Sequence, residues 1–267
     1  MKHVARKRFG QNFLTDKFVL DAIIEAIGPQ PEHAMVEIGP GLAAMTALLL
    51  KHVKHLHVVE LDRDLVTRLE KKFPPAQLTI HSGDALKFDY GQIPVPQGQK
   101  LRVVGNLPYN ISSPLLFHLA DFAHLIEDQY FMLQKEVVER MVAAPGSKVY
   151  GRLSVMLQWR YTMQLMFIVP PTAFEPPPQV ESAIVKMVPV AQRLACDGPT
   201  LEAVVLKAFS QRRKVIRNCL AGMFTEPQII EAGIDPSVRP EAIALAQYVA
   251  LANLLKPAPA DQANQDD

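Results

Sequence analysis

The sequence predicts an α/β protein with a mostly parallel sheet and a small all-helical region towards its C-terminal end. Short apolar runs typical of buried strands alternate with helical spacing of apolar residues over the first two thirds of the chain. The clearest of these runs lie at 35–38, 56–59, 78–81 and 101–104, and two β-rich runs at 164–169 and 182–188 predict a hairpin pair. Beyond Pro189 the spacing is helical with short loops, over 200–221, 226–232 and 241–255.

Length and composition are those of an ordinary globular protein. The chain has 267 residues, 49% of them hydrophobic, and a formal net charge of +1. No stretch is apolar for long enough to span a membrane, and the basic N-terminus lacks the apolar core of a secretory signal. Cys196 and Cys219 form neither a disulfide framework nor a metal-binding pattern. We therefore expect a cytoplasmic protein with no metal site.

A glycine turn separates the first of these strands from a helical segment. The turn reads Gly39-Pro40-Gly41, and Ala44 stands where a third glycine would let the helix pack closely on the strand. The next strand ends at Glu60, 21 residues after Gly39, close to the spacing at which an acidic side chain binds the ribose hydroxyls of a nucleotide. A glycine pair alone is weak evidence, but strand, turn, helix and acid together predict a nucleotide-type ligand.

The charge around this turn favours a cationic ligand over a phosphate. Glu37 precedes the glycines and Pro40 removes a backbone donor, whereas a pyrophosphate prefers a free helix N-terminus and a basic neighbour. S-adenosyl-L-methionine has an adenosine for Glu60, two cationic groups and no phosphate. The third strand ends close to Asp84, whose carboxylate we expect to accept the adenine amine of this cofactor. A turn or helix cap is the alternative role of Asp84.

The segment Asn106-Leu107-Pro108-Tyr109 follows the fourth strand. Pro108 has no N–H group to donate, so the Leu107 carbonyl and the Asn106 side chain are available as acceptors for a ligand amine. Tyr109 provides a flat ring on which a planar group stacks. Adenine combines a flat ring with an exocyclic amine. The four residues therefore predict a site for an adenine base, with a plain turn after a strand as the alternative.

The motifs resemble those of a known enzyme family. The glycine turn, the acids after the next two strands and the Asn-Leu-Pro-Tyr segment stand in the order and spacing of a methyltransferase that acts on adenine N6. With the flanking motifs, the chain resembles the small-subunit (16S) ribosomal RNA adenine N6,N6-dimethyltransferases of the KsgA/RsmA family over about residues 6–255. The matching segments are 6–14, 36–41, 59–62, 83–85, 106–109, 131–137, 174–178 and 211–214.

This resemblance implies a Rossmann-like class I methyltransferase fold with a mostly parallel seven-stranded sheet. It divides the chain into a methyltransferase domain at 1–189, a small helical RNA-binding domain at 190–256 and a disordered tail at 257–267. It implies S-adenosyl-L-methionine-dependent dimethylation of two adjacent adenosines in the 3′-terminal hairpin loop of small-subunit ribosomal RNA, linked to subunit biogenesis. The implied partner is the immature 30S subunit, and we expect the enzyme to be a monomer that does not contact membranes.

The resemblance also assigns roles to individual residues. It implies that the methyl transfer takes place among Asn106, Leu107, Pro108, Tyr109 and Phe174, with Phe174 as a second stacking wall for the target base. The alternative is that Phe174 fills the core. The implied cofactor contacts are Gln11, Asn12, Leu14, Gly39, Gly41, Glu60, Leu61, Asp84, Ala85 and Asn106.

Two basic segments are candidates for RNA binding. Basic runs are more often solvated faces, but an enzyme that holds a structured RNA needs phosphate contacts. At helical spacing, Arg213 and Arg217 are expected to share one face of a helix. The expected RNA contacts are Arg6, Lys7 and Arg8 in the N-terminal arm, and Arg212, Arg213, Lys214 and Arg217 in the helical region.

Four other hypotheses are weaker. His52, His55 and His57 cluster in the sequence, but no cysteine or carboxylate completes a metal site, so we expect them to be exposed. A nicotinamide dehydrogenase shares the glycine turn and Glu60 but leaves 106–109 unexplained. Large-subunit ribosomal methylases share the four core motifs, although the basic helix and the proline loop at 174–178 argue against them. The alternative from a different function class is a protein that acts chiefly as a ribosome-assembly binding factor, with methylation as a secondary activity. The two roles are compatible.

Overall fold

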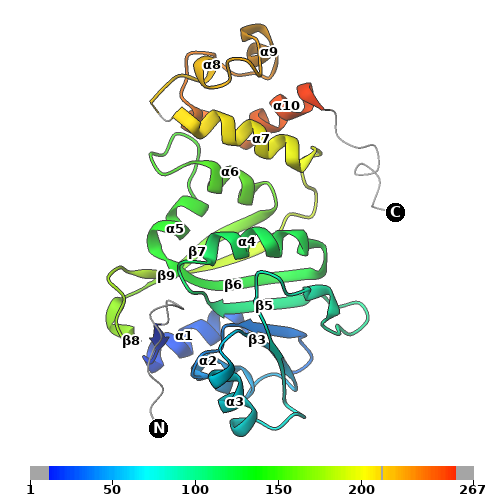
Figure 1. The fold of residues 1–267 in the computed structure, drawn as a ribbon, viewed down its shortest axis with the longest axis vertical. Coiled ribbons are helices and arrows are strands. Elements are labelled where there is room, and N and C mark those ends of the chain that lie inside the picture. Colours follow the sequence, from blue (N-terminus) through cyan, green and yellow to red (C-terminus); the bar gives the residue numbers. More distant parts are fainter. Residues whose placement is uncertain (1–11, 212, 257–267) are drawn as a thin grey trace. The chain divides into compact units, whose positions relative to one another are not determined.

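The computed structural model describes residues 12–211 and 213–256. Within these residues, one sheet contains seven strands in the order β4-β3-β2-β5-β6-β9-β7 (Figure 1). Strands β2 to β6 pair in parallel, and β9 runs antiparallel to β6. The predicted α/β fold with a mostly parallel seven-stranded sheet is therefore confirmed. The strands are β2 (Met35–Ile38), β3 (Leu56–Glu60), β4 (Leu78–Ser82), β5 (Leu101–Asn106), β6 (Ile126–Gln134), β7 (Tyr161–Val169) and β9 (Ser182–Pro189).

Helices cover the sheet through the apolar positions that the sequence spacing predicts. Helix α1 (Lys17–Ile27) begins where the Asp16 carboxylate accepts hydrogen bonds from the Phe18 and Val19 amides, and it ends at Gly28 in the left-handed conformation. Its buried side chains join those of α2 in one apolar core with alternate residues of the strands. The other helices of this part are α2 (Ala44–Leu49), α3 (Arg63–Lys72) and α4 (Ser112–Asp121).

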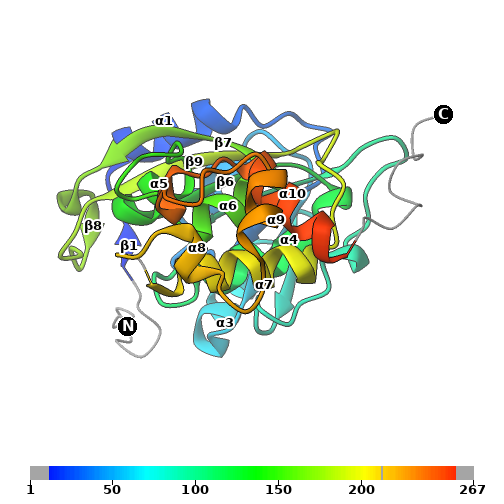
Figure 2. The ribbon, with the colours of Figure 1, turned by 90° about the horizontal axis from the view of Figure 1, so that it is seen from above.

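A second, two-stranded sheet joins the N-terminal segment to the proline loop. Strand β1 (Phe13–Leu14) pairs antiparallel with β8 (Phe174–Glu175), and the two lie side by side in Figure 2. The Thr15 amide extends this contact by donating to the Ala173 carbonyl. Residues 160 positions apart in the sequence are thereby brought together beside the main sheet.

A glycine allows two central strands to approach closely. Gly105 of β5 lies opposite Ile38 of β2, and a Cβ atom on Gly105 would stand 2.7 Å from the Ile38 carbonyl oxygen. No real side chain tolerates that distance to backbone, so the position requires glycine. The end of β5 therefore lies directly against the end of β2.

Arg102, the charge that interrupts the apolar run of β5, is buried in a network of partners. Its guanidinium makes two 2.8 Å hydrogen bonds to the carboxylate of Asp128, in the bidentate geometry of a strong ion pair. It also donates to the Ile27 carbonyl at the end of α1. The charge thus fastens α1 to β5 and β6, and because it is fully paired its burial is tolerated.

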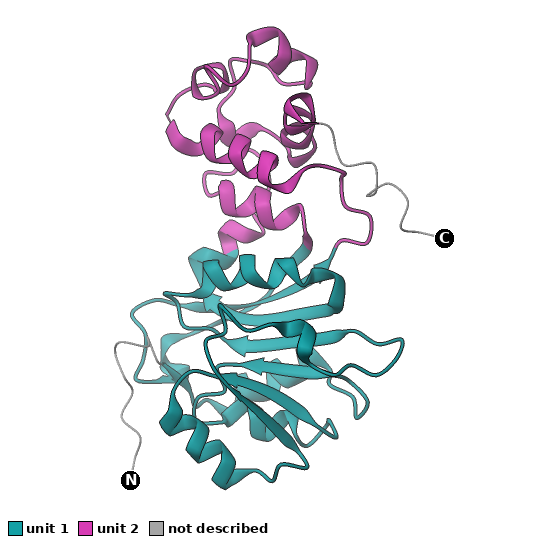
Figure 3. Cartoon of the chain, turned by 45° about the vertical axis from the view of Figure 1, so that its right-hand side comes forward, with its two compact units in different colours: residues 1–138, 162–189 teal, residues 139–161, 190–267 magenta. Residues whose placement is uncertain are grey.

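The chain forms two compact units (Figure 3). Unit 1 contains residues 1–138 and 162–189, and unit 2 contains 139–161 and 190–267. Residues 139–161 group with the helical unit because α6 packs on α7, and the division into domains at 189 stays a prediction. That unit 2 is an RNA-binding domain stays a prediction. Helix α5 (Lys135–Met141) crosses from unit 1 into unit 2, which also holds α6 (Arg152–Gln158), α7 (Gly198–Ala208), α8 (Ile216–Cys219), α9 (Glu226–Glu231) and α10 (Leu245–Leu255).

The single helix predicted over 200–221 is wrong. Helix α7 ends at Ala208, a short 3-10 turn follows over Phe209–Gln211, and a separate helix α8 starts at Ile216. The Ile216 amide donates to the Val238 carbonyl, which draws the chain out of the axis of α7. Arg213 and Arg217 therefore do not share the face of one helix.

The three clustered histidines are not all exposed as expected. His57 is buried in β3, and its ring stacks on His81 with a centroid distance of 5.4 Å. Burial and two neighbouring histidines lower the pKa of His57 to about 4, so the ring is neutral near pH 7. The expectation of exposure was wrong because all five residues of β3, including His57, are buried.

Ala43, the residue before α2, adopts a left-handed backbone conformation that favours glycine. Ala43 has a φ of +65° and precedes α2, whereas Ala44 is the first residue of that helix. A left-handed conformation costs an alanine about 1–2 kcal/mol. Ala43 is 2% exposed, so its methyl group recovers part of this cost by packing.

We predict that Ala43→Gly and Ala44→Gly differ in stability. Glycine relieves the backbone strain at 43, whereas at 44 it weakens a helix by about 0.5–1 kcal/mol. The free energy of unfolding of Ala43→Gly should therefore exceed that of Ala44→Gly by about 1 kcal/mol. Urea unfolding of the two variants measures the difference, and an equal or reversed order would contradict it.

Candidate active site

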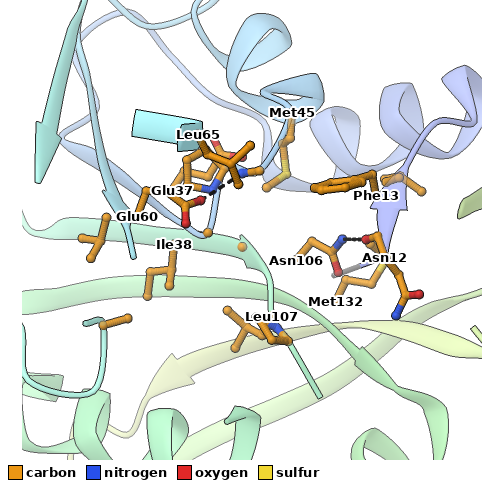
Figure 4. Close-up of a pocket in the computed structure, with 18 of the residues that line it drawn as sticks. Asn12, Phe13, Glu37, Ile38, Met45, Glu60, Leu65, Asn106, Leu107 and Met132 are labelled. Carbon is orange, nitrogen blue, oxygen red and sulfur yellow. Dashed lines mark hydrogen bonds between the residues drawn. The ribbon is translucent and has the colours of Figure 1, made fainter. Parts of the chain in front are cut away.

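One pocket in unit 1 collects most of the predicted site residues at the carboxyl edge of the parallel strands, where α/β proteins bind ligands (Figure 4). Further lining comes from Glu37, Met45 and Met132. Among the described residues that line it, none is a lysine or an arginine. The predicted residues in its wall are Asn12, Leu14, Gly39, Gly41, Glu60, Leu61, Asp84, Ala85, Asn106, Leu107, Pro108 and Tyr109.

The glycine turn forms one wall and is covered by Phe13. Gly39 and Gly41 have φ values of +66° and +56°, which glycine adopts without strain. A Cβ atom on Gly41 would lie 3.2 Å from the ring of Phe13. The turn thus keeps its backbone open towards the pocket while β1 packs against it.

Glu60 stands at the end of β3 with its carboxylate in the pocket wall. One oxygen accepts the Asp62 amide at 2.8 Å, and the other accepts the Gly41 amide at 3.3 Å. Burial raises the pKa of Glu60, and the backbone donors oppose this rise. The carboxylate is therefore fixed between the glycine turn and the start of α3, in the position from which an acid binds ribose hydroxyls.

Glu37 is the most deeply buried acid of the pocket. Its side chain is 2% exposed and accepts a 2.6 Å hydrogen bond from the Thr46 hydroxyl of α2. Burial raises the pKa of Glu37 to about 7, and the charge of Glu60 adds to the rise. A cation bound in the pocket would reverse this effect, which fits a cationic ligand. The sequence pointed to Glu37 but gave no sign of Thr46.

Asp84 occupies a turn and also lines the pocket. One carboxylate oxygen accepts the Leu86 amide at 3.0 Å, as in a turn or cap. The turn role is therefore present, and the contact with the adenine amine of the cofactor stays a prediction.

Asn106 ends β5 with its amide oriented by the N-terminal segment. Its Nδ2 donates to the Asn12 carbonyl at 3.1 Å, the contact drawn in Figure 4. Within the described chain, Oδ1 of Asn106 accepts no hydrogen bond. The amide therefore offers its oxygen to a ligand.

The next residues of this segment place an acceptor and a ring beside Asn106. The Leu107 amide donates to the Met132 carbonyl at 3.2 Å, whereas its own carbonyl accepts no hydrogen bond from the described residues. Tyr109 is half-buried and its hydroxyl bonds to Ser182 at 2.8 Å. Burial raises the pKa of Tyr109, so the phenol stays protonated near pH 7.

Phe174 does not line the pocket, contrary to the expectation that it forms a second stacking wall. Its side chain is 4% exposed and belongs to the apolar core. Pairing with β1 sets Phe174 opposite Leu14 and turns its ring inward. The alternative that the sequence left open, a core side chain, is the one found.

The predicted RNA-binding residues are only partly described. Gln11 of the cofactor set, the arm residues Arg6, Lys7 and Arg8, and Arg212 lie outside the described residues, as does the tail at 257–267. In unit 2, Arg213, Lys214 and Arg217 are all exposed, and Arg217 lies 3.8 Å from the carboxylate of Glu226.

Residues 12–211 and 213–256 contain neither a membrane-spanning helix nor a group of side chains that could hold a metal ion. In these ranges no helix is both long and apolar enough to cross a membrane. No group of three or more histidine, cysteine or acidic side chains has the geometry to hold a metal ion there.

Sequence comparison identifies the family. The profile of the family described as ribosomal RNA adenine dimethylase matches residues 2–256. The chain belongs to the ribosomal RNA adenine dimethylase family. It is 75% identical to the ribosomal RNA small subunit methyltransferase A of Janthinobacterium sp. (strain Marseille), over 96% of this chain and 100% of the relative. It is 74% identical to the protein of the same name from Herminiimonas arsenicoxydans, with the same coverage of both chains.

A solved structure supports the fold of this dimethylase. A dimethyladenosine transferase from Plasmodium falciparum superposes with a TM-score of 0.76 at 23% identity, covering 90% of this chain and 95% of the other. The protein is thus a ribosomal RNA methyltransferase with a Rossmann-like fold, and the dehydrogenase hypothesis is wrong. Its methyl donor is S-adenosyl-L-methionine. The pocket fits this cofactor because three buried acids, Glu37, Glu60 and Asp62, line it and none of its described lining residues is basic.

We predict that Glu37 makes the stability of the protein without cofactor depend on pH. The folded pKa of about 7 exceeds the ordinary value of 4.5, so the folded protein binds a proton that the unfolded chain releases. The free energy of unfolding should therefore fall as the pH rises from about 4.5 to about 7. In Glu37→Gln the fall should be smaller, by on the order of 1–3 kcal/mol.

Urea unfolding at several pH values between 5 and 8 tests this. The exposed control Glu70→Gln should keep the pH dependence of the parent protein. If the difference between Glu37→Gln and the parent did not change with pH, the buried carboxyl would not be the responsible group.

Proposed function

We propose that the protein transfers methyl groups from S-adenosyl-L-methionine to the N6 amines of two adjacent adenosines in the 3′-terminal hairpin loop of small-subunit ribosomal RNA. The substrate fits the names of the relatives at 74–75% identity, which are small-subunit enzymes rather than large-subunit methylases. The single observation that supports the chemistry best is the Asn106 amide. Its nitrogen is held by Asn12 and its oxygen faces no other partner in the described chain.

The adenine amine needs help because its lone pair is delocalised into the ring. In the proposed reaction, the Asn106 Oδ1 and the Leu107 carbonyl accept hydrogen bonds from the N–H groups of the amine. This favours a pyramidal nitrogen whose lone pair is free to attack. The cofactor, when bound, would supply an activated methyl group. As the new C–N bond forms, the S–CH3 bond would break, the demethylated cofactor would leave, and the nitrogen would release one proton to water. Holding the amine in line with that methyl lowers the barrier by up to about 7–11 kcal/mol.

The ring of the target stacks on Tyr109 in this proposal. The phenol is protonated, so it acts as a surface and not as a base. Phe174 is buried in the core, so of the two predicted stacking residues only Tyr109 lines the pocket as it stands. The target base must leave its own stack to enter, which costs least in a loop.

Glu60, Asp84 and the glycine turn hold the cofactor in the proposal, and Glu37 faces its cationic end. All described lining residues of the pocket come from unit 1 of a single chain. We therefore propose that the enzyme acts as a monomer. The substrate would be the immature 30S subunit in the cytoplasm, and the transfer would be linked to subunit assembly.

We predict that Asn106→Ala lowers turnover far more than RNA affinity. The lost acceptor acts mainly in the transition state, so the single-turnover rate should fall roughly 100-fold or more. The assay incubates labelled S-adenosyl-L-methionine with undermethylated small subunits and maps the labelled nucleosides. Asn253→Ala in α10, which removes an amide that donates to Ala195, is the matched control and should keep the parent rate.

The mapping also tests the function itself. Label on two adjacent N6,N6-dimethyladenosines near the 3′ end is the expected result. Label elsewhere, or on large subunits alone, would disprove the proposed substrate. A normal rate for Asn106→Ala with correct labelling would disprove only the role of the amide.

We propose that the exposed basic residues of unit 2 bind RNA phosphates. Replacing Arg213 and Lys214 together by alanine should then weaken RNA binding and reduce the slope of log K against log salt by roughly 1–2. Cofactor affinity should stay unchanged. Lys71→Ala/Lys72→Ala, at the exposed end of α3, removes the same charge from unit 1 and should leave the slope as it was. An equal effect of both pairs would indicate a non-specific charge effect.

A further inference from the structure

Tyr109 is held at both ends. At its backbone end, the Ser112 hydroxyl donates to the Tyr109 carbonyl at 3.0 Å. At the far end of the ring, the phenol oxygen lies 2.8 Å from Oγ of Ser182. Stacking by itself does not need a phenol hydroxyl, so the contact with Ser182 calls for a separate explanation.

Ser182 is a fixed point of the sheet. It is the first residue of β9, is completely buried and pairs with Gln134 of β6. The preceding residue, Glu181, is held twice by Lys135, through its carbonyl at 3.0 Å and its carboxylate at 2.7 Å. Tyr109, in contrast, lies in the irregular segment between β5 and α4. The hydroxyl contact therefore ties a loop residue to a rigid strand.

We propose that Ser182 is a positioning residue, which holds the Tyr109 ring at a fixed position against the target adenine through the hydroxyl contact. The inference rests on the proposed methyl transfer to adenine. The phenol oxygen lies on the axis of the Cβ–Cγ bond, so a hydrogen bond to it restrains rotation about the Cα–Cβ bond, the rotation that would swing the ring away from the base. A base stacked on a ring held in this way keeps its amine at a fixed place relative to Asn106 and Leu107. Since small displacements of the reacting atoms reduce the rate strongly, the position of the ring affects catalysis.

This role makes a specific prediction about two residues. Ser182→Ala and Tyr109→Phe each remove one side of the same contact, and neither removes the ring. Each should slow single-turnover methylation about threefold to tenfold, as expected for one hydrogen bond. The double variant should be no slower than either single variant, because the contact is lost only once. Tyr109→Ala, which removes the ring itself, should be slower than all three.

Two further measurements separate positioning from a purely structural role. The affinities for S-adenosyl-L-methionine and for undermethylated small subunits should match those of the parent, so the loss lies in turnover and not in binding. With 2-aminopurine in place of the target adenosine, time-resolved anisotropy should show a more mobile base in Ser182→Ala and in Tyr109→Phe. This second readout requires no turnover.

Ser154→Ala is the matched control. Ser154 is also completely buried and also donates a hydrogen bond, to the Arg140 carbonyl of unit 2. It should lose stability without a change in base mobility or rate. Parent-like rates and anisotropy in Ser182→Ala, or additive losses in the double variant, would overturn the proposal. If the parent protein methylated no adenosine, the proposed function would fail instead.

Discussion

The pocket depends on the close contact between two backbones, where β5 lies against β2 at Gly105 and Ile38. The contact places the carbonyl of Asn106 3.9 Å from where a Cβ of Gly39 would stand. The segment proposed to hold the target base and the turn proposed to hold the cofactor therefore share one edge of the sheet. Any side chain at 105 would clash with the Ile38 backbone. The two strand ends could make room for it only by breaking the parallel ladder between them.

The pocket also carries an electrostatic cost in the absence of its ligand. Glu37 and Glu60 are both buried, and the pKa of each is raised. No basic side chain among the described lining residues compensates them. A positively charged ligand removes the conflict, and an anionic ligand such as a pyrophosphate increases it. The preference for a sulfonium cofactor thus follows from the two buried carboxylates, Glu37 and Glu60, which no basic side chain among the described lining residues neutralises.

Local signals were enough to predict the strands, the glycine turn and the acids that follow the strands. Each depends on a short period or on one residue type, as for Glu60 at the end of β3. What the sequence could not provide are contacts between distant segments. Phe174 is turned inward by pairing with β1, α7 is interrupted where Ile216 bonds to Val238, and Ser182 meets Tyr109 across 73 positions.

The division of the chain has a consequence for synthesis on the ribosome. Residues 139–161 belong to unit 2 but are synthesised before β7 and β9 of unit 1. In the folded chain they include buried side chains such as Leu153 and Trp159. Their packing partner α7 begins only at Gly198. During translation these apolar side chains therefore stay uncovered until the last quarter of the chain emerges. A product shortened at 189 would lack α7 and would leave exposed the side chains that pack on it.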